Sequence, residues 1–231
     1  MSAPAAMPRY DMYRLIHKGL RALMADTLTA LGSLDCDDPI ELADVLGRVR
    51  GLLDFCRSHL AHEDGFVHPA MEAREPGSAG EALSDHAEHE REIAGLEAAV
   101  AAVEAAPGGE RAAAAHALYR GLAVFVGENL VHMDHEESHN NAVLWRRYRD
   151  DELVAIEQAI VASQPPEEQM VTIRWIVAAA SPAERAGFLG AIRDAAPPEV
   201  FGAILDMVQA HLRPADRAKL ARALSRPALA A

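Results

Sequence analysis

Apolar side chains recur every three or four residues in four long stretches of the chain. The stretches cover roughly residues 9–31, 39–73, 78–106 and 110–149, and Gly- or Pro-containing breaks separate them. This spacing is typical of amphipathic helices that bury one face. Short connections between long helices require antiparallel neighbours, so the pattern predicts an all-α fold with an antiparallel, up-down-up-down four-helix bundle.

The pattern changes after residue 150, where short apolar faces alternate with Pro-containing breaks at 164–167, 181–184, 196–199 and 213–216. Proline is favoured at the first positions of a helix, and Ser181 with Glu184 has the form of a capping box. We therefore expect a bundle domain over 1–150 and a helical accessory region of several short helices over 151–231. This C-terminal helical extension is expected to pack on the bundle, on a protein partner or on a second copy of the chain.

Polar residues interrupt the apolar faces of the bundle at equivalent places. The second and fourth predicted helices both contain H-x-x-H-E followed by an acidic residue, at 59–64 and 132–137. Residues four apart lie on the same side of a helix, so a His and a Glu at this spacing can hold two sides of one metal centre. The other two helices each contribute one histidine to their apolar face. The resulting pattern has an approximate twofold repeat, formed by His17, His59, Glu63, His86, His132 and Glu136.

Carboxylates on the inner faces of a bundle indicate a cation, because a buried ionised carboxylate is unfavourable unless it is paired or coordinates a metal. A mixed His and Glu set without thiolate favours iron, with manganese or zinc as alternatives. Glu90, four residues after His86, is included as a ligand, and its alternative is to orient a ligating histidine. His89 is expected at the surface or behind the ligands, and it is also the main alternative to Glu90 as the ligand. Tyr13 is expected beside the ligands, where packing is its alternative role.

Composition and charge limit the partners and the cellular location that we expect for the protein. The 231 residues carry a formal net charge of −13, which argues against nucleic acid and anionic membrane surfaces as partners. The N-terminal residues lack the apolar segment of a secretory signal, and no apolar stretch is long enough for a transmembrane helix. We expect a cytosolic protein.

These residues resemble the hemerythrin-like family, also called the His-His-Glu cation-binding domain, over roughly residues 8–150. The resemblance rests on H-x-x-x-E at His59 and Glu63 and again at His132 and Glu136, with one histidine on each alternate helix. It implies a non-haem site for two iron ions, with the two glutamates similar to the bridging carboxylates and the histidines to the terminal ligands.

One departure from the family bears on function. Oxygen-carrying members have H-x-x-x-H in the third helix, whereas this chain has Glu90 four residues after His86. A carboxylate there disfavours reversible oxygen binding. The sequence therefore predicts a di-iron protein that binds or reacts with oxygen, peroxide or nitric oxide in sensing, detoxification or redox and iron homeostasis. A metal-stabilised signalling module and a di-iron oxidase or peroxidase-like enzyme are the alternatives, and no catalytic residue is assigned.

Overall fold

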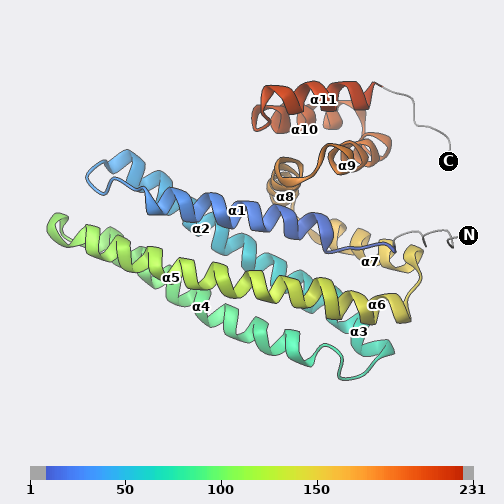
Figure 1. Cartoon of the computed structure of the whole chain (residues 1–231), viewed down its shortest axis with the longest axis horizontal. Coiled ribbons are helices and arrows are strands. Elements are labelled where there is room, and N and C mark those ends of the chain that lie inside the picture. Colours follow the sequence, from blue (N-terminus) through green and yellow to red (C-terminus); the bar gives the residue numbers. More distant parts are fainter. Residues whose placement is uncertain (1–8, 226–231) are drawn as a thin grey trace, which may run out of the picture. The chain divides into compact units, whose positions relative to one another are not determined.

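The computed structural model describes residues 9–225, and every regular element within them is a helix (Figure 1). The long helices form a four-helix bundle, and further helices follow it, which confirms the predicted fold class. None of the described helices combines the length and the apolar character needed to cross a membrane. The long helices are α1 (Arg14–Gly32), α2 (Pro39–His62), α4 (Gly80–Ala105) and α5 (Gly108–His135).

The described residues divide into two compact units. The first unit contains 9–14 and 23–163, and the second contains 15–22 and 164–225. The predicted boundary at residue 150 differs, because α7 (Asp150–Ser163) groups with the first unit. Local contacts explain this grouping, since Arg74 Nη2 lies 2.7 Å from Glu152 Oε1 and Leu153 is buried in a core cluster of the same unit.

Local chemistry fixes where two of the bundle helices begin. Asp38 caps α2, since its Oδ1 accepts hydrogen bonds from the backbone N–H of Ile40 at 2.8 Å and of Glu41 at 3.2 Å. Pro39 occupies the first turn, where its missing N–H is tolerated. Before α4, Gly77 has a φ of 85°, a left-handed conformation that side chains disfavour, and it turns the chain after α3 (His68–Arg74).

The buried face of α4 follows a regular alternation of three- and four-residue steps. Its buried residues are Ala82, His86, His89, Ile93, Leu96, Val100 and Val103. The side chain of Glu90, which the sequence analysis included as a ligand, is instead 47% exposed, and Leu83 is 43% exposed. The buried face of α4 therefore includes His89 and not Glu90.

Two π-helical turns interrupt what the sequence analysis expected to be continuous helices over 39–73 and 110–149. The turns η1 (Glu63–Val67) and η2 (Glu136–Asn140) directly follow α2 and α5, and α3 and α6 (Asn141–Arg147) continue from them. A π turn accommodates an extra residue and is frequent at functional sites. Both turns begin at the glutamate of the repeated motif, so the repeat extends to backbone geometry.

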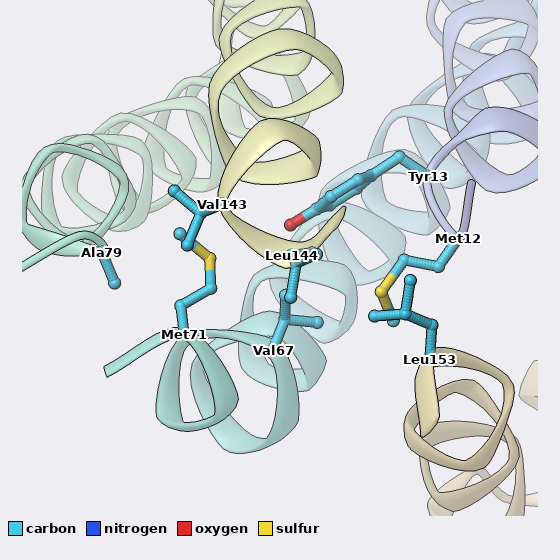
Figure 2. Packing of buried hydrophobic residues seen from close by; sticks show 8 residues of the cluster. All are labelled: Met12, Tyr13, Val67, Met71, Ala79, Val143, Leu144 and Leu153. Atoms are coloured by element: carbon cyan, nitrogen blue, oxygen red, sulfur yellow. The ribbon is translucent and has the colours of Figure 1, made fainter. Parts of the chain in front are cut away.

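A hydrophobic cluster packs around the segments that follow the two π turns (Figure 2). Val67 and Met71 come from η1 and α3, and Val143 and Leu144 come from α6. Tyr13 contributes its ring from the start of the bundle. The remaining members of the cluster are Met12, Ala79 and Leu153.

The second unit contains four short helices, each with proline in its first turn. They are α8 (Pro166–Ala179), α9 (Pro182–Ala195), α10 (Pro198–Ala210) and α11 (Pro214–Leu224). A Cβ added to Gly19 would lie 3.0 Å from the backbone nitrogen of Ile176, so glycine permits the 15–22 segment to approach α8 closely. The core of this unit includes Val177, Leu189, Ile204, Val208 and Leu220.

Replacing Ser181 with alanine is expected to destabilise this unit by about 1 kcal/mol, because it removes the N-cap of α9. The predicted capping box is present: Ser181 N–H donates to Glu184 Oε2 at 2.9 Å, and Glu184 N–H donates to Ser181 Oγ at 3.4 Å. Urea unfolding followed by circular dichroism measures the change. Ser163→Ala is the control, since the Ser163 hydroxyl donates only to Ile160 O near the end of α7. Equal stability of the two variants would contradict this role.

Candidate metal centre

Four buried side chains of the bundle converge on one point. They are Glu63, His86, His132 and Glu136, and each offers a ligand atom within 4.8 Å of the others. The Nε2 atoms of His86 and His132 are 3.2 Å apart. Glu63 Oε2 lies 3.4 Å from His86 Nε2, and Glu136 Oε2 lies 3.5 Å from His132 Nε2. Four helical elements, η1, α4, α5 and η2, thus direct imidazole and carboxylate groups at the same small volume.

Glu63 also faces a second group of ligands. Its Oε1 lies 3.4 Å from His59 Nε2, while its Oε2 faces His86. The ligand atoms of His59, Glu63 and Glu136 lie within 4.8 Å of one another. The two carboxylates therefore belong to both groups, which is the arrangement needed for bridging two metal ions.

Two further carboxylates hold the outer nitrogens of the histidines. Asp64 Oδ1 lies 2.8 Å from His86 Nδ1, and Asp85 Oδ2 lies 3.2 Å from His132 Nδ1. Because an ionised carboxylate only accepts hydrogen bonds, each Nδ1 carries the hydrogen. This tautomer leaves the Nε2 lone pair for a metal, a common arrangement around ligating histidines.

The sequence analysis did not identify Asp64 and Asp85 as site residues. Each is adjacent in sequence to a ligand of one helix while it holds a ligand of another, so only the folded bundle reveals the pairing. The sequence feature that could have pointed to Asp64 is its place as the acidic residue directly after the first H-x-x-H-E motif. His68, which the sequence analysis also did not include in the site, is buried, and its Nδ1 lies 2.9 Å from Asp64 Oδ1.

The charges around the centre favour a cation. Burial opposes the charged form of His86, but the nearby carboxylates of Glu136, Glu63 and Asp64 raise its pKa to about 9. Burial lowers the pKa of His132, and burial together with His132 and His86 lowers the pKa of His89 to about 4. The two buried glutamates thus stabilise positive charge at His86, as they would a metal cation.

The structure brings together five of the seven predicted ligands, namely His59, Glu63, His86, His132 and Glu136. It does not bring Glu90 to them, because the Glu90 side chain is half exposed and its Oε2 lies 3.3 Å from Arg57 Nε. His17 is fully buried on α1, in the 15–22 segment assigned to the second unit, and it stays a predicted ligand.

The two residues predicted to surround the ligands are both buried. The ring of His89 packs edge-on against that of His132, with centroids 4.8 Å apart. The Tyr13 hydroxyl accepts a hydrogen bond from Asn140 Nδ2 at 3.3 Å. Burial, then the charges of Glu136 and Glu63, raise the pKa of Tyr13, so its hydroxyl stays protonated beside the carboxylates.

Replacing Asp64 with asparagine is expected to weaken metal binding by about 10- to 100-fold, because the neutral amide supports the Nδ1–H of His86 less strongly than a carboxylate. Competition with a chromophoric chelator measures this affinity. Asp44→Asn is a matched control, since Asp44 is an exposed carboxylate on α2, the helix that leads into η1 and Asp64. Equal affinities in both variants would show that Asp64 does not support the centre.

Comparison with known proteins agrees with the geometry. The family described as hemerythrin HHE cation binding domain matches residues 9–144. This span contains all of the converging histidines and glutamates, and it ends before α7. No curated protein and no solved structure gave a match to the chain.

Proposed function

Because the chain belongs to the hemerythrin HHE cation-binding domain family, we propose that it is a non-haem di-iron protein that binds or reacts with a small oxidant. The ligand class is oxygen, peroxide or nitric oxide, and the role is sensing, detoxification or redox and iron homeostasis in the cytosol. The observation that carries the proposal is that Glu63 and Glu136 belong both to the group with His86 and His132 and to the group with His59.

The donor set fits iron. Imidazole nitrogens and carboxylate oxygens without thiolate suit ferrous and ferric ions, and carboxylates that face two groups can neutralise two cations. We propose that His86 and His132 hold one ion and that His59 and His17 hold the other, with Glu63 and Glu136 shared. The Asp64 and Asp85 contacts support this assignment, since they direct two imidazoles inward.

Bound iron would supply redox chemistry and an exchangeable position for the small molecule. The protein residues would determine what reaches it. His89 and Phe125 lie edge to face beside His132, with ring centroids 6.0 Å apart, and both are buried. This aromatic wall limits water near the centre, while the protonated Tyr13 hydroxyl offers a hydrogen-bond donor close to the two glutamates.

The position of Glu90 supports a reactive centre. Because Glu90 pairs with Arg57, the metal position beside His86 has four protein donors. These are two histidines and the two shared carboxylates. Iron sites with few protein ligands keep positions for an exogenous molecule. Because Glu90 is not one of the proposed ligands, its carboxylate adds no negative charge to the metal centre.

Anaerobic reconstitution with Fe(II), followed by exposure to oxygen, peroxide or nitric oxide, tests the proposal. We expect about two irons per chain and new charge-transfer absorption with at least one of these molecules. His59→Ala should abolish the spectral change. Failure to take up Fe(II) would overturn the metal assignment, and stable iron binding without any spectral response would favour a structural metal in a signalling module.

A further inference from the structure

A cavity in the second unit has more cations than carboxylates among its lining residues. It has a volume of about 460 Å³ and lies where the end of α8, the start of α9, the end of α10 and the start of α11 meet. Its charged lining residues are three cations and a single carboxylate, namely Arg185, Arg213, Lys219 and Asp216. This local excess of positive charge contrasts with the formal net charge of −13 of the whole chain.

Arg185 is the central feature of the cavity because it is a buried guanidinium. Its Nε donates to Val177 O at 2.7 Å and its Nη2 donates to Ala180 O at 2.9 Å, so two nitrogens cap the end of α8. The third nitrogen, Nη1, is buried and has no hydrogen-bond partner among the described residues. A buried donor without an acceptor is unfavourable, and Arg185 lines the cavity, so its guanidinium adds positive charge there that no hydrogen bond at Nη1 compensates.

Asp216 does not satisfy Arg185. Its Oδ2 accepts a hydrogen bond from Arg213 Nε at 2.7 Å, while its Oδ1 lies 3.9 Å from Arg185 Nη1, beyond hydrogen-bonding distance. Lys219 Nζ is 3.6 Å from the same Oδ1. One carboxylate is thus shared by three cations, and an additional anionic group would complete their pairing.

We propose that this cavity, named here the Arg185 cavity, binds the phosphate group of a small phosphomonoester. A phosphate monoester carries a charge of about −1.5 to −2 near pH 7, which matches the local surplus of positive charge. Guanidinium groups bind phosphate oxygens with directed, charge-assisted hydrogen bonds. The volume exceeds that of a phosphate ion alone and is in the range of small-molecule sites, so the ligand is a phosphorylated small molecule.

Isothermal titration of the full chain with glycerol 3-phosphate and with inorganic phosphate tests the site. We expect saturable binding at one site per chain, with glycerol 3-phosphate bound at least as tightly as phosphate. The double variant Arg213→Ala/Lys219→Ala should weaken binding about tenfold or more, because it removes two cations and leaves the buried Arg185 cap of α8 in place. Arg217→Ala is the matched control, since Arg217 is exposed on α11 and does not line the cavity.

Three outcomes would overturn the proposal. The first is no binding up to about 10 mM of either compound. The second is equal binding by the wild-type chain and the double variant, which indicates unspecific attraction. The third is binding to vesicles that contain phosphatidic acid without any response to the soluble phosphates, which indicates a membrane surface as the partner. Binding that survives in Arg217→Ala and is lost in the double variant supports the site.

Discussion

Glu63→Ala and Glu136→Ala should each reduce the iron content of reconstituted protein from about two ions per chain to well below one. Each glutamate belongs to both groups of ligands, so its loss removes a donor from two metal positions at once. The loss also leaves fewer negative charges to balance the cations within a buried site. Metal analysis of the purified variants after Fe(II) reconstitution measures the effect.

Glu90→Ala provides the control for these variants. Glu90 lies four residues after His86 on α4, but it pairs with Arg57 at the surface, so its removal should leave about two irons bound. Loss of iron in this variant would show that Glu90 ligates, as the sequence analysis predicted. Retention of both irons in Glu63→Ala would contradict the shared-carboxylate geometry.

Adding Fe(II) to metal-free protein should stabilise the bundle by about 4 kcal/mol when the free metal exceeds its dissociation constant a thousandfold. For a chain of this size, that stabilisation corresponds to a rise in melting temperature of about 10 °C. The physical reason is that Glu63 and Glu136 are buried, and a buried carboxylate is destabilising until a cation compensates it. Anaerobic thermal unfolding with and without Fe(II) measures the shift.

The Glu136→Ala variant tests whether that stabilisation comes from the proposed centre. It should melt at the same temperature with and without Fe(II), because it lacks a shared ligand. An equal shift in the variant and in the wild-type chain would place the stabilising metal elsewhere.

The hydrophobic periodicity was sufficient to predict the bundle. It also indicates which residues of α4 form the buried face. From His86 the buried positions continue by three residues to His89 and by four to Ile93. The sequence analysis instead stepped four residues to Glu90, following the H-x-x-x-H spacing of the family it resembles. Local periodicity was the better guide there, since helix packing determines which side of α4 faces the core.

Other features depended on contacts between elements that are distant in sequence. The π turns after α2 and α5 have no sequence signature that separates them from ordinary helix, and they shift the buried positions that follow. After η2 begins, Asn140 is buried and His139 is exposed. The Arg185 cavity likewise forms only when four helices meet, so no short motif predicts it.

The Asp64 and Asp85 contacts connect the orientation of the metal ligands to the alignment of neighbouring helices. Asp64 follows the Glu63 ligand after α2 and holds His86 on α4, while Asp85 precedes His86 and holds His132 on α5. A sliding movement of α4 along its axis would therefore change the direction of two imidazoles together. In the same way, binding or release of metal would favour a different position of α4 along its axis. Occupancy of the metal centre and the register of the helices are therefore coupled.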